Sequence, residues 1–222
     1  MTTSRVAALI KKTRANRGRL IIAMDATASR EVMWDVASKL MGDMFMEVAA
    51  IGGLDVQLVY YSGAYGEVKS LPWTADAAEL VKQMGMIRCS AGPTNIEQIL
   101  RYVHGEHRRE KVSAAAFIGD AIEETPADLY AAVKDLGVPL FVFQEGSGDV
   151  VDPREPIRRQ PVDEIFRELA RMTGGAYGRF DAGSAKQLGE LLRAIAAFAV
   201  GGMAELARQK TESARLLIGQ MK

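Results

Sequence analysis

Short apolar runs that alternate with longer segments of helical period constrain the fold of this chain more than any other feature. Runs of this kind, apolar at nearly every position, suit the strands of a parallel sheet that is covered on both faces. The expected strands are residues 19–25, 55–62, 112–120, 138–145 and 176–181. The segments between them have the apolar spacing of helices, and the expected helices are residues 31–50, 75–85, 95–104, 127–136 and 162–172.

This alternation predicts an α/β fold: a doubly wound, mostly parallel central sheet with helices on both faces, as in Rossmann-like folds. A turn punctuated by glycines in residues 61–73 predicts one antiparallel edge strand. A chain of 222 residues is the right size for one such domain. We therefore expect a single domain over residues 1–200 and a helical extension over residues 201–222.

The expected extension follows the glycine pair at 201–202 and has the pattern of an amphipathic helix. Its apolar side chains recur at helical spacing: Met203, Leu206, Ala207, Ala214, Leu217 and Met221. Such a stripe must be buried. The sequence leaves two hypotheses open: the helix folds back onto its own domain, or it binds a partner or a second copy of the chain.

Composition limits the partners and the compartment. Lys and Arg number 28 and so do Asp and Glu, so no net field draws the molecule to nucleic acid or to an anionic membrane. The single cysteine, Cys89, excludes an internal disulfide and favours a reducing compartment. The most apolar stretch, residues 191–206, contains two glycines and two charged residues, so no membrane insertion is expected. We expect a soluble cytoplasmic protein.

Polar side chains gather where the expected strands end. Asp25 closes the first strand and is followed by Thr27 and Ser29; Asp120 closes the third strand, and Thr94 precedes a helix. In doubly wound sheets, ligands bind beyond the carboxyl ends of the strands. Two carboxylates and three hydroxyls, without histidine or thiolate, suit a hard divalent cation such as Mg²⁺ or Mn²⁺. Such a site leaves a coordination position for a carboxylate from outside.

The same residues form a familiar pattern. The motif DATAS at 25–29, GPT at 92–94 and GD at 119–120 together resemble the metal-ion-dependent adhesion site, or MIDAS, of the von Willebrand factor A family. The resemblance covers most of residues 18–199 and includes the turn TGGAY at 173–177, which in the family precedes the last strand.

The resemblance implies a metal-ion-dependent protein-protein interaction module rather than an enzyme. It implies that Asp25, Thr27, Ser29, Thr94 and Asp120 hold Mg²⁺ or Mn²⁺, and that a protein partner supplies a carboxylate to the ion. Nearby, the acidic pair at 123–124 adds negative charge that would repel an acidic ligand or attract a basic one.

Other interpretations of the same residues remain open. Thr94 with Glu97 has the pattern of a capping box, and Ser29 could serve only as an N-cap. A magnesium-dependent enzyme of phosphate chemistry would also use Asp25, but residues 25–29 lack a second carboxylate two positions on, and no Walker-type motif is present. A nucleotide-binding Rossmann-like protein would need a G-x-G-x-x-G motif after the first strand, which is absent.

Overall fold

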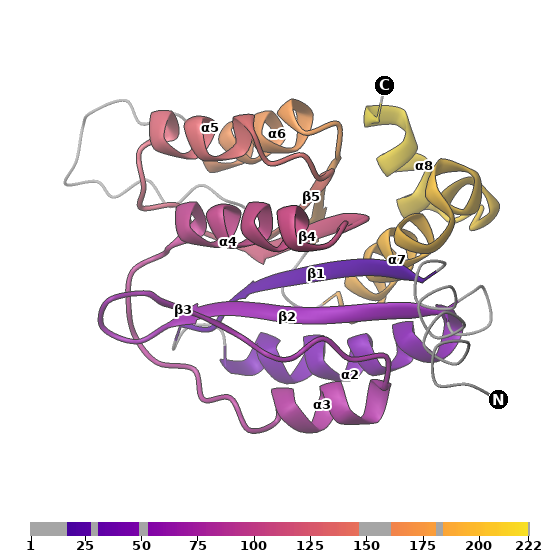
Figure 1. Ribbon diagram of the computed structural model, residues 1–222, viewed down its shortest axis with the longest axis horizontal. Coiled ribbons are helices and arrows are strands. Elements are labelled where there is room, and N and C mark those ends of the chain that lie inside the picture. The colour runs from indigo at the N-terminus through magenta and orange to yellow at the C-terminus, as the bar shows by residue number, and fades with distance from the viewer. Residues whose placement is uncertain (1–16, 28–30, 49–52, 147–160, 181–183, 222) are drawn as a thin grey trace, which may run out of the picture.

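The computed structural model describes residues 17–27, 31–48, 53–146, 161–180 and 184–221. Helices and strands alternate along most of the chain (Figure 1). The strands are β1 (Gly18–Asp25), β2 (Leu54–Ser62), β3 (Glu67–Ser70), β4 (Ala114–Gly119), β5 (Leu140–Glu145) and β6 (Tyr177–Phe180). The helices are α2 (Glu31–Val48), α3 (Ala77–Met84), α4 (Ile96–Arg109), α5 (Pro126–Lys134), α6 (Val162–Met172), α7 (Ala185–Arg208) and α8 (Glu212–Gln220).

The strands form one six-stranded sheet in the order β3-β2-β1-β4-β5-β6. All neighbouring strands are parallel except β2 and β3, which form an antiparallel hairpin at one edge. The predicted doubly wound fold with one antiparallel edge strand is therefore confirmed.

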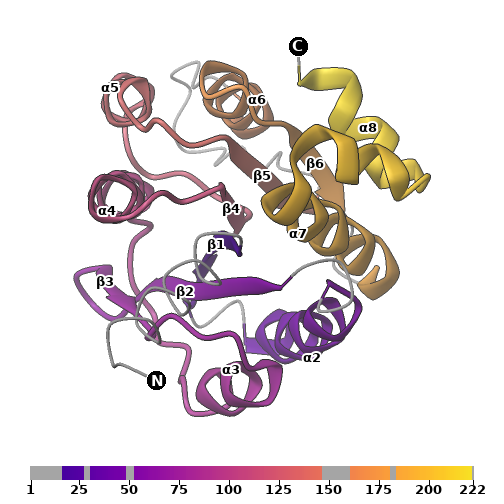
Figure 2. The same ribbon diagram turned by 45° about the vertical axis from the view of Figure 1, so that its right-hand side comes forward.

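Two hydrophobic cores lie on the two faces of the sheet, because successive side chains of a strand point to opposite faces. In β1, Leu20, Ile22 and Met24 pack with α2 and α7, whereas Ile21 and Ala23 pack with α4, α5 and α6. Figure 2 shows these two helical layers on either side of the sheet. Every residue of β1 is buried, which explains why its sequence is apolar at nearly every position.

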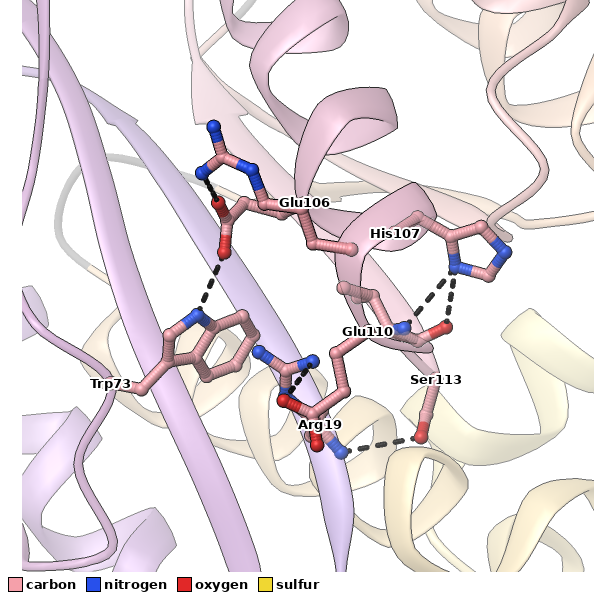
Figure 3. A network of polar contacts seen from close by, with 8 residues as sticks. Arg19, Trp73, Glu106, His107, Glu110 and Ser113 are labelled. Carbon is pink, nitrogen blue, oxygen red and sulfur yellow. Dashed lines mark hydrogen bonds and ion pairs between the residues drawn. The ribbon is translucent and has the colours of Figure 1, made fainter.

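A polar network closes the end of the sheet where β1 and β4 begin (Figure 3). The guanidinium of Arg19 stacks 3.9 Å from the ring centroid of Trp73, whose indole Nε1 donates to Glu106 over 3.0 Å. Arg19 also pairs with Glu110 over 3.1 Å, and its backbone N–H donates to the hydroxyl of Ser113 over 3.2 Å. These polar groups therefore bond to one another, at the opposite end of β1 from Asp25.

The C-terminal segment packs on its own domain. Helix α7 continues through the glycine pair and kinks at Gly202, where φ is 63° and ψ is −155°, so the predicted division at residue 200 falls next to this kink. Helix α8 buries Ala214 and Leu217 in the same core as β1. The Gln220 side chain accepts from the backbone N–H of Tyr177 over 2.9 Å and donates to its carbonyl over 2.8 Å, which pairs part of the free edge of β6.

The apolar stripe predicted for this segment is only partly correct. Leu206, Ala214 and Leu217 are buried, but Met203 and Ala207 are exposed. A second break at Lys210, where φ is 52°, makes α8 a separate helix, so one helical stripe does not run through the whole segment. Among the described residues, no helix is long and apolar enough to cross a membrane.

Candidate metal centre

Two of the candidate ligands, Asp25 and Asp120, lie where the strand order of the sheet reverses. β1 and β4 are adjacent in the middle of the sheet, and the chain continues outward from them in both directions. Asp25 is the last residue of β1, and Asp120 directly follows β4. Figure 1 shows the two strands running side by side. This topological switch point is where doubly wound sheets bind their ligands.

Asp25 and Thr27 are fixed by the turn that follows β1. The Asp25 carboxylate accepts a 2.7 Å hydrogen bond from the backbone N–H of Thr27, and only 3% of Asp25 and 8% of Thr27 are exposed. The backbone N–H of Ala26 donates to the carbonyl of Tyr61 over 3.1 Å, which holds the turn against β2. Ser29, the third predicted ligand of this motif, lies outside the described residues.

The buried side chain of Tyr61 is affected by three acidic groups, Asp25, Glu124 and Asp120. It is the register partner of Asp25 across β1 and β2, and its side chain is 0% exposed. Burial raises the pKa of the Tyr61 phenol, and the negative charges of Asp25, Glu124 and Asp120 raise it further. The hydroxyl lies near the Asp25 carboxylate but has no well-formed hydrogen-bond partner. A buried hydroxyl in this state is costly unless a further group satisfies it.

Thr94 is held by a residue that the sequence did not predict for this role. Its hydroxyl donates to the Glu124 carboxylate over 2.6 Å and accepts from the backbone N–H of Glu123 over 2.9 Å. The alternative interpretation, a capping box of Thr94 with Glu97, is wrong, because α4 has Asn95 as its N-cap residue and the backbone N–H of Glu97 donates to Glu124. Glu97 instead forms an ion pair with Arg101 over 2.6 Å, one turn along α4, so its carboxylate points along the helix and away from the cap.

The hairpin of β2 and β3 braces the loop that carries Thr94. The Asn95 side chain donates to the carbonyl of Gly66 over 2.8 Å. A Cβ atom on Gly92 would lie 1.9 Å from the carbonyl oxygen of Gly63, so the two backbones touch at a point where no side chain fits. The position of Thr94 therefore depends on a glycine two residues before it.

Substitution of Gly92 by alanine is expected to lower the free energy of unfolding by about 1–3 kcal/mol, the usual effect of overpacking. Gly105→Ala in α4 is the control, because a Cβ there meets no atom within 4 Å. The control should raise stability by up to about 1 kcal/mol, as Ala replaces Gly inside a helix. Urea unfolding of both variants measures the difference. A Gly92→Ala protein as stable as wild type would refute the close approach.

The donor set fits a hard cation better than a soft one. The described residues contain no group of three or more His, Cys, Asp and Glu side chains placed to hold an ion. A site that uses two carboxylates and several hydroxyls does not need such a group, and the buried hydroxyl of Tyr61 lies within reach of the charges of Asp25 and Asp120. His107 hydrogen-bonds the backbone of Val112 over 3.2 Å. Oxygen ligands of this kind suit Mg²⁺ and Mn²⁺.

Comparison with known proteins gives a likeness of structure rather than of sequence. No family model matches the sequence, and comparison with curated proteins gives no match. An aerotolerance-related membrane protein from Bacteroides fragilis is 19% identical and has a TM-score of 0.58, over 79% of this chain and 96% of its own. A von Willebrand factor type A protein from Catenulispora acidiphila is 16% identical with a TM-score of 0.57, over 84% of this chain and 43% of its own.

The chain has the fold of a von Willebrand factor A domain. Proximal thread matrix protein 1 from the mussel byssus, a structure with a zinc-occupied MIDAS motif, also matches: it is 13% identical with a TM-score of 0.58, over 83% of this chain. This chain spans only 43% of the Catenulispora structure and 46% of the mussel structure. At such identities the likeness concerns the von Willebrand factor A fold itself.

Proposed function

We propose that this von Willebrand factor A domain is a protein-binding module that uses a divalent cation to dock an acidic side chain of a partner. The ion would be held by Asp25, Thr27, Ser29, Thr94 and Asp120. Mg²⁺ or Mn²⁺ would supply the positive charge that binds the partner's carboxylate. The proposal excludes catalysis as the main role of the site and needs no nucleic acid.

One observation carries the proposal: Asp25 ends β1 and Asp120 directly follows β4, and these adjacent parallel strands form the switch point of the sheet. Two carboxylates neutralise a divalent ion, and the hydroxyl ligands leave its charge unaltered. Mg²⁺ keeps several waters in its shell, so one of them can yield to a carboxylate from a partner. The zinc-occupied MIDAS of the mussel structure supports divalent metal binding on this fold.

Variants of Thr94 test whether this residue binds the ion or has only a structural role. Mn²⁺ at 10 to 100 times its dissociation constant should stabilise the wild type by about 1.4–2.7 kcal/mol through linkage. That corresponds to a rise of roughly 3–10 °C in melting temperature for a domain of this size. Thr94→Ser should keep this rise, because it keeps the hydroxyl.

Thr94→Asn should lose the rise, because an amide side chain can still bond to the neighbouring loop but changes the ligand geometry. Melting temperatures with Mn²⁺ and with a chelator measure both variants. A Thr94→Asn protein that Mn²⁺ stabilises as much as the wild type would mean that Thr94 does not bind the ion.

A further inference from the structure

Glu124 bridges the candidate metal site and the start of α4. One oxygen of its carboxylate accepts from the Thr94 hydroxyl over 2.6 Å. The other oxygen accepts hydrogen bonds from the backbone N–H groups of Ile96 and Glu97. Its distance to the Glu97 nitrogen is 3.3 Å. The N-cap residue itself, Asn95, makes no capping hydrogen bond with its side chain. A residue from the loop after β4 therefore satisfies the first turn of α4.

The contacts of Thr94 determine how its hydroxyl can bind an ion. A hydroxyl has one proton and two lone pairs. The Thr94 hydroxyl donates its proton in a hydrogen bond to Glu124, and one of its lone pairs accepts a hydrogen bond from the backbone N–H of Glu123 over 2.9 Å. One lone pair remains. Because the other two directions are occupied, the direction of the remaining lone pair is fixed by Glu124 and by the backbone beside it.

Glu124 also lies close to the other candidate ligands. Its charge raises the pKa of the buried Tyr61 phenol, as do the charges of Asp25 and Asp120. The described residues hold no cluster of three carboxylates that could bind an ion together. Glu124 is half-buried, and both of its carboxylate oxygens accept hydrogen bonds, one of them from Thr94. Its contacts are those of a residue that orients a ligand.

We propose that Glu124 is a positioning residue of the metal site, which turns the free lone pair of Thr94 toward the ion. The inference rests on the proposed metal binding. A carboxylate that accepts a hydrogen bond from a metal ligand orients that ligand and increases its electron density. Loss of such a partner typically weakens metal affinity 10–100-fold. Because the same carboxylate caps α4, Glu124 links the ion site to that helix.

Three variants test this role. Glu124→Gln keeps the size of the side chain but removes the negative charge of the group that accepts the hydrogen bond from the Thr94 hydroxyl. Glu123→Gln is the matched control, since it removes the same charge from the exposed neighbouring residue. Glu124→Asp keeps the charge but shortens the side chain, so that the contact with Thr94 is lost. Mn²⁺ affinity is measured by calorimetry well below the melting temperature of each metal-free variant, which separates affinity from stability.

We expect Glu124→Gln and Glu124→Asp to weaken Mn²⁺ binding at least about tenfold, and Glu123→Gln less than about threefold. Equal affinities for Glu124→Gln and Glu123→Gln would overturn the inference and leave Glu124 as a helix cap. Wild-type affinity in Glu124→Asp would also overturn it, because charge alone would then suffice. Either result leaves the proposed function intact, whereas a wild-type protein that binds no Mn²⁺ refutes both.

Discussion

Removal of residues 210–222 is expected to lower the melting temperature of the domain by roughly 6–12 °C, which corresponds to about 3 kcal/mol at this size. The deletion removes Ala214 and Leu217 from the core and uncovers their neighbours on α7 and β6. It also removes Gln220, which pairs with the backbone of Tyr177 at the edge of β6. An uncovered edge strand is a site of aggregation, so the truncated chain should also be less soluble.

Two adjacent leucines of α8 sharpen this prediction. Leu217 is 0% exposed and Leu216 is 48% exposed. Leu217→Ala should cost about 2–3 kcal/mol in urea unfolding, the lower part of the usual range for a large-to-small change in a core, because loss of the whole helix costs about 3 kcal/mol. Leu216→Ala should change stability by less than about 0.5 kcal/mol. If α8 instead bound a second copy of the chain, both the truncation and Leu217→Ala would reduce the mass in solution, and the monomer would keep its stability.

The sequence predicted most of the fold because local patterns specify it. The five parallel strands lie within two residues of their predicted bounds at each end, since β-rich apolar runs bounded by polar residues have few alternatives. Helix α4 extends to Arg109 rather than ending at residue 104. Its last turns contain Glu106, which is buried because it bonds to Trp73, a contact between distant segments that helical spacing does not reveal.

The candidate site was predictable in part for the same reason. Asp25 and Asp120 follow apolar runs, so their position at strand ends follows from local sequence. The role of Tyr61 depends on the register between β1 and β2, and that of Glu124 on a contact with Thr94 across 30 positions. From the sequence alone, the acidic pair that contains Glu124 indicates only additional negative charge. The pattern of a capping box misled because the backbone N–H of Glu97 donates to the Glu124 carboxylate, in the place that the pattern gives to the Thr94 hydroxyl.

Asp25→Asn is expected to weaken Mn²⁺ binding at least about 100-fold. A carboxylate beside a divalent ion contributes several kcal/mol at an effective dielectric of about 20, and each 1.4 kcal/mol is a factor of about ten. Asparagine keeps the shape of the side chain and the oxygen that accepts from Thr27 N–H, so the turn after β1 should persist. Asp135→Asn is the control, because it alters an exposed aspartate at the end of α5.

Calorimetric titration of Mn²⁺ into the wild type, Asp25→Asn and Asp135→Asn tests the central claim most directly. The account predicts one ion per chain in the wild type and in Asp135→Asn, with similar affinities, and no measurable heat of binding in Asp25→Asn. Circular dichroism should show that all three proteins are folded. A folded wild type that binds no Mn²⁺ or Mg²⁺ at millimolar concentrations, or an Asp25→Asn protein that binds the ion as tightly as the wild type, would contradict it.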